Sequence, residues 1–273
     1  MRQQQPWQLT GNSPEQYERY QVTSLFGPLA HRFLSLMDLQ AGERVLDVAC
    51  GTGIVARLAA PQVGATGRVT GVDLNPGMLA VATAHAPASG APIDWRAGDA
   101  GALPCADASY DVVLCQQGLQ FVADPAHALR EMQRVLRPGG RLGLSVWTRI
   151  EHTPFNYAVY TASARWLGTE AAARLLAPFA LGDLAVLRTL ITAAGFRDVD
   201  LQVASITRHM AAPDVAIPGY LASTPLAPIV AALDAAVRTA LLREISDALQ
   251  AYRDHDGLAV PSETAIARAQ KAG

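Results

Sequence analysis

The stretch VLDVACGTGIVARLA, from Val45 to Ala59, decides the fold of this chain. Its apolar, β-prone start predicts a buried strand, its glycines predict a tight turn, and the remainder predicts a helix. The segment from Gly51 to Ala56 satisfies the dinucleotide fingerprint G-x-G-x-x-G/A. An acid, Asp47, nevertheless stands four residues before the first glycine. A pyrophosphate favours a positive helix end without a nearby anion, so the acid raises the question of which ligand fits this corner.

The composition is that of a globular protein. The 273 residues are 50% hydrophobic and 17% charged, enough to bury a full core. The net charge of -2 gives no basic excess, so we expect no nucleic-acid partner. Three cysteines, Cys50, Cys105 and Cys115, are too few for a disulfide framework or a zinc site and indicate reduced thiols in a cytoplasmic protein. No signal peptide and no run of about 18 uncharged apolar residues is visible, so we expect no membrane span.

Strand and helix patterns alternate after Glu43. The runs RVLDVA, RVTGVD, IDWRAGD and YDVVLCQ predict strands, with helical patterns between them. Alternation of this kind predicts an α/β fold, a Rossmann-like doubly wound sheet that is mostly parallel. A fifth strand is expected over Arg141 to Trp147 and a sixth over VDLQVASITRHM. The tail alternates from about Ser262, which predicts a last, antiparallel strand.

The chain shows no linker of biased composition, so we expect a single domain over residues 1–273. Within it we expect an N-terminal helical cap at 13–40 and a cofactor-binding core at 43–148. Two helical insertions, at 150–182 and 210–256, are expected to cover the substrate site.

Three acids recur every 26 residues, Asp47, Asp73 and Asp99, each at or just beyond a predicted strand end. Ligands of doubly wound sheets bind outside the carboxyl ends of the strands. Asp73 follows Gly53 by 20 residues, the spacing at which a carboxylate can bind ribose hydroxyls. The glycines alone would fit a purely structural turn, whereas strand, helix and acid together favour a nucleoside. Three carboxylates without a clear basic partner suit a nucleoside that carries a sulfonium and an ammonium, which favours S-adenosylmethionine over NAD.

With these motifs the chain resembles the class I S-adenosylmethionine-dependent methyltransferases. It is most similar to the small-molecule group with a methyltransferase type 11 domain that includes the ubiquinone/menaquinone-biosynthesis enzymes. The resemblance runs from Tyr17 to about Trp147 and rests on VLDVACGTG, GVDLNPGMLAVA, GDAGALPCADASYDVVLCQQGLQF and EMQRVLRPGGRLGLSVW. It implies S-adenosylmethionine as cofactor, S-adenosylhomocysteine as product, and methyl transfer to O, N or C of a small organic acceptor.

The resemblance also implies which residues hold the cofactor. Asp47 would hold its ammonium group, Asp73 both ribose hydroxyls and Asp99 the adenine amino group. Tyr20, on the N-terminal helix, would close the pocket from above. The other implied contacts are Ala49, where many relatives carry glycine, and Gly51, Gly53, Leu74, Met78, Ala100 and Gln116.

Methyl transfer is an in-line displacement at a carbon already activated by positive sulfur, so alignment and exclusion of water do much of the work. A general base is needed only when the nucleophile must lose a proton. His152 follows the fifth strand, where this fold places substrate contacts, and is a candidate base or substrate ligand; a structural role is the alternative. Further candidates for the acceptor pocket, which core packing would explain as well, are Gln117, Gln120, Phe121, Trp147 and Phe155.

Two other classes of protein compete with this interpretation. A nicotinamide-linked reductase would need a Tyr-x-x-x-Lys pair, but the only lysine is Lys271, near the carboxyl terminus. A non-catalytic or regulatory protein that binds S-adenosylmethionine stays open, because an intact binding motif does not prove turnover. A homodimer through the helical insertions also stays open.

Overall fold

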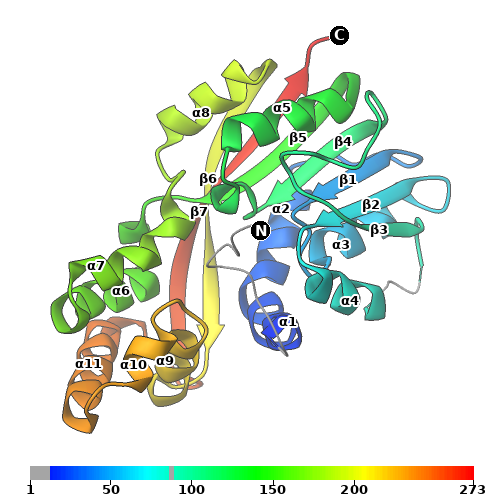
Figure 1. Ribbon diagram of the computed structural model, residues 1–273. Helices are drawn as coiled ribbons and strands as arrows, with labels where there is room; N and C mark the ends of the chain where they lie inside the picture. The colour runs from blue at the N-terminus through cyan, green and yellow to red at the C-terminus, as the bar shows by residue number, and fades with distance from the viewer. Residues whose placement is uncertain (1–12, 86–88) are drawn as a thin grey trace.

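The computed structural model describes residues 13–85 and 89–273, which build one mixed sheet with helices on both faces (Figure 1). The seven strands lie in the order β3-β2-β1-β4-β5-β7-β6. Strands β1 to β5 pair in parallel, whereas β7 runs antiparallel to both of its neighbours. This confirms the predicted Rossmann-like sheet with an antiparallel last strand. The strands are β1 Arg44–Val48, β2 Arg68–Asp73, β3 Ile93–Ala97, β4 Tyr110–Gln116, β5 Leu136–Trp147, β6 Phe196–Met210 and β7 Leu258–Lys271.

Helices cover the two faces of the sheet with separate apolar cores. Helices α5 (Pro125–Val135) and α8 (Leu184–Ala193) share one core with β1, β4, β5 and β7. Helices α2 (Gly27–Leu34) and α3 (Ile54–Val63) share the other core with β1, β2 and β4. Three helices begin at residues that commonly cap helices, since Asn75, Asp124 and Asp183 each accept a hydrogen bond from a backbone N–H of the following first turn. Asn75 caps α4 (Pro76–Ala84), which packs on β2 and β3.

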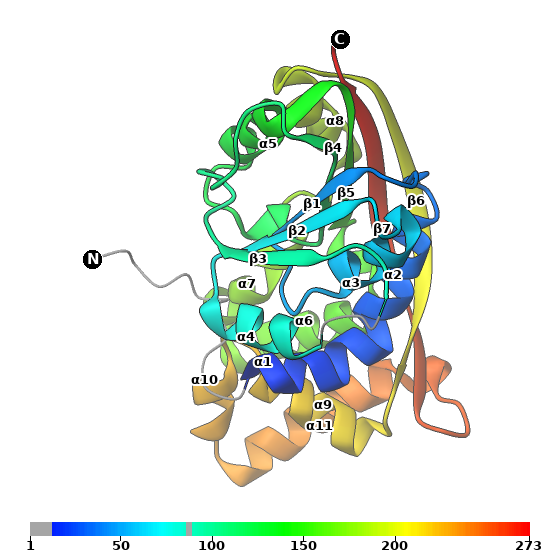
Figure 2. The ribbon, with the colours of Figure 1, turned by 90° about the vertical axis from the view of Figure 1, so that its right-hand side faces the viewer.

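The segments expected as helical insertions fold together into what we call the helical lobe. It holds α6 (Pro154–Leu167), α7 (Thr169–Ala173), α9 (Pro213–Ala222), α10 (Ala227–Ala231) and α11 (Ala235–Ala248). Their apolar side chains form one cluster with Leu258 and Val260, at the start of β7. Figure 2 shows the lobe at one end of the long strands β6 and β7. Because β5 runs antiparallel to β7, this end lies beyond the carboxyl end of β5, where ligands of such sheets bind.

The N-terminal segment crosses the same end of the sheet. It consists of α1 (Ser13–Gln16), the π-helical segment η1 (Tyr17–Phe26) and α2. Helix α1 packs on α4, and η1 contacts β6, the strand at the other edge of the sheet. The remaining short helical segments are η2 (Leu119–Phe121), η3 (Ile150–His152), η4 (Arg174–Phe179) and η5 (Gln250–Tyr252).

Candidate functional site

The glycine corner lies directly beyond β1 and turns the chain into α3. Ala49, Gly51 and Gly53 have φ values of 55°, 57° and 85°, all in the left-handed region. Glycine adopts this region freely, whereas alanine does so at a cost of about 1 kcal/mol. Ala49 therefore adopts the same left-handed conformation as the two glycines, at a small cost in backbone strain. A side chain at Gly53 would collide with the ring of Trp95.

The carboxyl group of Asp47 is the most buried of the three acids at the site. Its side chain is 1% exposed, and Oδ2 accepts a hydrogen bond of 3.0 Å from the backbone N–H of Ala56 in α3. Burial raises the pKa of Asp47 to about 8, and the neighbouring carboxylate of Asp73 adds to the shift. Among the described residues no basic side chain forms an ion pair with it. The site therefore offers a buried acceptor to a positive group that the described residues do not supply.

Asp73 ends β2 beside this corner. Its Oδ2 accepts from the N–H of Gly51 at 2.8 Å and its Oδ1 from the N–H of Asn75 at 2.8 Å. Burial raises the pKa of Asp73 although these hydrogen bonds oppose the shift. Each carboxylate oxygen can accept more than one hydrogen bond, so both retain capacity for a pair of hydroxyl groups.

Asp99 follows the end of β3, and a backbone hydrogen bond holds this part of the chain beside Asp73. The N–H of Gly98 donates to the backbone oxygen of Asp73 at 3.0 Å, and the N–H of Gly101 donates to Oδ1 of Asp99 at 2.9 Å. Asp99 and the following Ala100 are half-buried. The acids that recur along the sequence thus reach one edge of the sheet, with Asp73 between the other two.

Apolar and amide groups complete the predicted cofactor side. Leu74 is 38% exposed and Met78 is half-buried, so both present apolar surface beside Asp73. Gln116, at the end of β4, donates from Nε2 to the backbone oxygen of Phe26 at 3.2 Å. Its Oε1 is buried without a hydrogen-bond partner in the described part of the chain. A buried acceptor without a partner costs free energy, so this amide points to a missing donor.

Two tyrosines of η1 differ in their surroundings. The side chain of Tyr20 is 56% exposed, and the guanidinium of Arg19 lies over its ring. Tyr17, which the sequence analysis did not single out, lies near Gly51 and is stacked on Phe26 with ring centroids 5.3 Å apart. Withdrawal of its hydroxyl from solvent raises the pKa of Tyr17, and the charges of Asp73, Glu18 and Asp47 add to this. The residues from Tyr17 form a π-helix, whose wider turn gives faces that α-helical spacing does not predict.

His152 forms a pair that the sequence did not reveal. Its Nδ1 lies 2.7 Å from Oε1 of Glu263 in β7, and Thr148 donates to the same oxygen at 3.0 Å. A carboxylate that holds Nδ1–H leaves Nε2 as the proton acceptor of a neutral ring. The pair is half-exposed at the carboxyl end of β5, because Glu263 directly precedes Thr264, the register partner of Trp147.

The predicted acceptor residues divide into an amide pair and apolar side chains. Nε2 of Gln117 donates to Thr264 at 2.8 Å, and Nε2 of Gln120 donates to Oε1 of Gln117 at 3.0 Å. Oε1 of Gln120 is buried without a partner in the described residues. Phe121 is half-buried, Trp147 is 8% exposed beside Phe26, and Phe155 lies inside the core of the helical lobe. The structure therefore brings the amides and Trp147 to the strand ends and places Phe155 deeper, among the helices.

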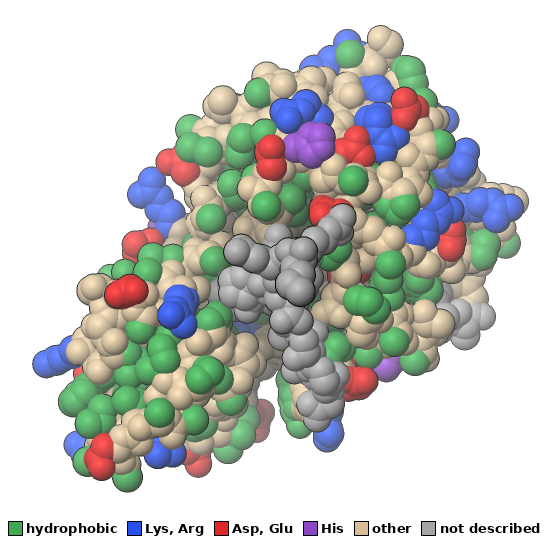
Figure 3. Space-filling model, viewed as in Figure 1, with side chains coloured by type: hydrophobic (Ala, Val, Ile, Leu, Met, Phe, Trp, Pro, Cys, Tyr) green, Lys and Arg blue, Asp and Glu red, His purple; other side chains and the backbone are tan. Residues whose placement is uncertain are grey.

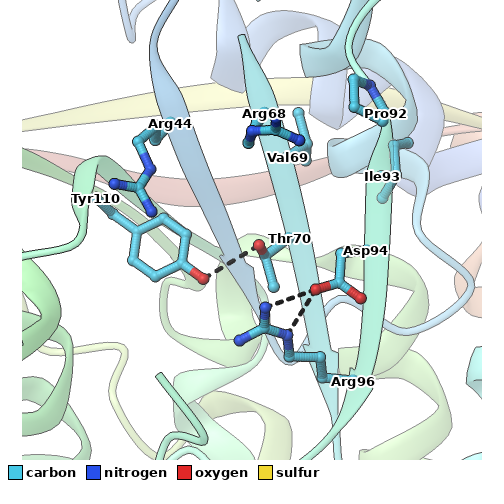
Figure 4. A pocket seen from close by; sticks show the side chains of 9 residues that line it. All are labelled: Arg44, Arg68, Val69, Thr70, Pro92, Ile93, Asp94, Arg96 and Tyr110. Atoms are coloured by element: carbon cyan, nitrogen blue, oxygen red, sulfur yellow. Dashed lines mark hydrogen bonds and ion pairs between the residues drawn. The ribbon is translucent and has the colours of Figure 1, made fainter. Parts of the chain in front are cut away.

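A separate cavity of about 240 Å³ lies at the opposite end of the strands (Figure 4). It is lined by the first residues of β1, β2 and β3 and by Tyr110, whose hydroxyl donates to Thr70 at 3.1 Å. None of the predicted site residues lines it. On the face shown in Figure 3, basic and acidic side chains are interspersed.

Two absences concern only the described ranges 13–85 and 89–273. They hold no group of three or more His, Cys, Asp or Glu side chains that could bind a metal ion. No single helix in them is long and apolar enough to cross a membrane. A pair bent by 53°, Thr169–Phe179 with Leu184–Ala193, meets that length and composition only when combined.

Comparison with known proteins agrees with the site. A methyltransferase domain family matches residues 46–144. The ubiquinone/menaquinone biosynthesis C-methyltransferase of Rubrivivax gelatinosus is 37% identical over 177 residues, which cover 62% of this chain and 68% of that protein. The chain therefore belongs to the S-adenosylmethionine-dependent methyltransferases, in the group of the ubiquinone and menaquinone biosynthesis enzymes, and S-adenosylmethionine is its cofactor.

Other relatives match over shorter stretches. The 2-phytyl-1,4-naphtoquinone methyltransferase of Synechococcus elongatus is 44% identical over 105 residues, 38% of this chain. The chain spans only 45% of the length of that relative. The ubiquinone biosynthesis O-methyltransferase of Ruegeria pomeroyi is 37% identical over 166 residues, 59% of this chain and 62% of that protein.

Solved structures show the same fold. The YcgJ protein of Bacillus subtilis superposes with a TM-score of 0.56 at 18% identity, over 89% of this chain and 99% of that one. Phosphoethanolamine N-methyltransferase 2 of Haemonchus contortus, solved with S-adenosyl-L-methionine, gives 0.54 at 18% identity, over 89% of this chain and 53% of that one.

Asp73→Ala is expected to weaken S-adenosylmethionine binding by about 1–3 kcal/mol, because two hydroxyl groups lose a charged acceptor. Calorimetric titration measures the change. Asp94→Ala is the matched control, since Asp94 lies on the neighbouring strand β3, is exposed and pairs with Arg96. Equal affinity of the two folded variants would remove Asp73 from the site.

Cofactor binding near pH 7 is expected to release about one proton from Asp47. With a pKa of about 8 the ligand-free carboxyl group holds its proton at pH 7, and a bound ammonium group favours the ionised form. The affinity should therefore rise with pH up to about 8. Titrations at pH 7 in phosphate and in Tris, which differ in ionisation enthalpy, should give different apparent binding enthalpies.

Asp47→Asn is the control for this release, because its amide oxygen can still accept from Ala56. It should remove the dependence on buffer and weaken binding. A raised carboxyl pKa makes the folded protein lose stability as the pH rises from about 4 to 8, so the ligand-free variant should also unfold at a higher temperature at pH 7.5. Wild-type enthalpies that agree between the two buffers would show that Asp47 does not change protonation.

Proposed function

We propose that this chain is an enzyme that transfers the methyl group of S-adenosylmethionine to a small, quinone-related acceptor. The observation that carries the proposal is the buried Asp47 with the half-buried Asp73 beside it, two acids without a basic partner in the described chain. A ligand with both a sulfonium and an ammonium group supplies the missing charge and has ribose hydroxyls for the second acid. A dinucleotide would instead bring further negative charge to this edge.

The cofactor residues take distinct roles in this proposal. Asp47 binds the ammonium group, directly or through water, and Asp73 binds the ribose hydroxyls. Asp99 accepts from the adenine amino group, while the N–H of Ala100 meets a ring nitrogen. Leu74 and Met78 pack on the adenine, and the backbone at Ala49, Gly51 and Gly53 passes close to the methionine part. Gln116 offers its free Oε1 to that part as well.

The acceptor class follows from the relatives. Their names include a C-methyltransferase and an O-methyltransferase of quinone biosynthesis at the same 37% identity, and a naphthoquinone enzyme. A reduced, phenolic quinone ring is common to both reactions, so we place such a ring between the strand ends and the helical lobe. Gln117, Gln120, Phe121 and Trp147 would line its pocket at the strand ends, and Phe155 its deeper wall.

The protein's own contribution to the chemical step is alignment, exclusion of water and removal of a proton. The bound cofactor supplies a methyl group already activated by its sulfonium. A phenol or a ring carbon must lose a proton during or after attack, so a base raises the rate. We assign this role to Nε2 of His152, with Glu263 as the positioning residue that holds Nδ1.

Turnover with S-adenosylmethionine bearing a labelled methyl group, and a panel of reduced benzo- and naphthoquinones, tests the activity. His152→Ala should lower kcat by about 10²–10⁴-fold and leave the affinity for S-adenosylhomocysteine unchanged, because proton removal is lost and cofactor binding is not. Glu263→Gln should lower kcat less, because Nδ1 keeps a neutral acceptor.

His209→Ala is the matched control, since His209 lies exposed on β6. If the cofactor binds but no acceptor of the panel becomes labelled, the result would favour a regulatory protein that binds S-adenosylmethionine without turnover. A His152→Ala enzyme with wild-type kcat would exclude the base.

A further inference from the structure

Arg208, in β6, is buried among apolar and aromatic side chains. Its side chain is 7% exposed, and it is the one arginine among the buried residues in the described chain. Its Nη2 donates to Oε1 of Gln21 in η1 at 2.6 Å, whereas its Nε is buried without a partner. A guanidinium is a fixed positive charge with five donors, so this one is incompletely satisfied.

No carboxylate of the protein neutralises this charge. All Asp and Glu residues lie within the described ranges, and none of them forms an ion pair with Arg208. Two half-buried arginines differ in this respect, since Arg57 pairs with Glu18 and Arg141 with Glu43, both at 2.6 Å. Burial accordingly lowers the pKa of Arg208. An unpaired buried charge costs several kcal/mol, which an anionic ligand would offset.

The surroundings form a partly aromatic wall with a second polar group. The guanidinium lies 5.8 Å from the ring centroid of Phe155, and Tyr220 meets that ring edge-on with centroids 5.0 Å apart. Asn156 donates to the Tyr220 hydroxyl at 2.6 Å, so the hydroxyl hydrogen is free to point elsewhere. Three elements, η1, α6 and α9, thus bring polar or aromatic groups to one side of β6.

The strand register places this group on the acceptor side of the site. Trp147 pairs with Thr264, which pairs with Ala204, four residues before Arg208 on β6. Four residues of strand span about 13 Å. Ile206, on the same face of β6, packs with Trp147, Leu25 and Leu29. The apolar side chain of Ile206 therefore lies between the end of β5 and the buried guanidinium along β6.

We propose that Arg208 is the binding site for an anionic oxygen group of the acceptor, a carboxylate or a phenolate on an otherwise apolar molecule. The inference rests on the proposed function, in which the acceptor lies between the strand ends and the helical lobe. The anion accepts from Nε of Arg208, while Phe155 and Ile206 contact the apolar body. The site thereby selects acidic acceptors over neutral ones of the same shape.

The test compares 2-naphthoate with 2-naphthamide, which share a shape but differ in charge. Their affinities are measured by calorimetry on the full chain with and without saturating S-adenosylhomocysteine. Wild type should bind the acid at least about tenfold tighter than the amide. Arg208→Gln should reduce this ratio to about one, and Arg208→Lys should restore part of it. Arg197→Gln, an exposed arginine on the same strand, should keep the wild-type ratio.

The outcomes separate the two proposals. Failure to bind S-adenosylhomocysteine contradicts the proposed function, whatever the naphthoate result. The anion site is overturned by the wild-type protein alone if it binds naphthoate and naphthamide equally tightly. It is also overturned if the wild-type protein binds neither probe. An Arg208→Gln protein that binds S-adenosylhomocysteine as wild type does and still prefers the acid also overturns it.

Discussion

The buried carboxyl group of Asp47 is the constraint on which the site depends. It lies inside the sheet on β1, with one backbone N–H from α3 as its hydrogen-bond partner. Because its pKa is raised to about 8, this carboxyl group makes the ligand-free fold less stable as the pH rises from about 4 to 8, so its retention needs a compensating role. In the proposed complex a positively charged ligand provides that compensation, and the neighbouring Asp73 binds the ribose of that ligand. On this proposal charge selects the cofactor more than the glycine pattern does.

A second buried ionisable group lies on the acceptor side. Arg208 is buried without a carboxylate partner, as Asp47 is buried without a basic partner in the described chain, and η1 contributes a residue to the surroundings of each, Gln21 and Tyr17. In the proposed complex the cofactor neutralises the acid and the acceptor neutralises the arginine. Both ligands would then stabilise a protein that bears the cost of two unpaired groups when it is empty.

Local patterns predicted the fold and the cofactor side, because these depend on residues close in sequence. The strand, turn and helix around Gly51, and the spacing from it to Asp73, need no long-range information. The acceptor side depends on pairings that a single sequence does not display. Glu263 reaches His152 only because β7 inserts between β5 and β6, and Arg208 meets Phe155 only because the fold brings α6 beside the distant strand β6. The place of Tyr17 beside Gly51 depends on the π-helical form of η1, which local sequence patterns do not reveal.

The measurement that tests the account most directly is a calorimetric titration of the full chain with S-adenosylmethionine, S-adenosylhomocysteine and NAD. The account predicts binding of the two sulfur nucleosides and no binding of NAD, since only the former bring an ammonium group to Asp47 without a pyrophosphate. Binding of NAD alone would contradict it, and would mean that the fingerprint from Gly51 to Ala56 serves a dinucleotide despite the neighbouring acids.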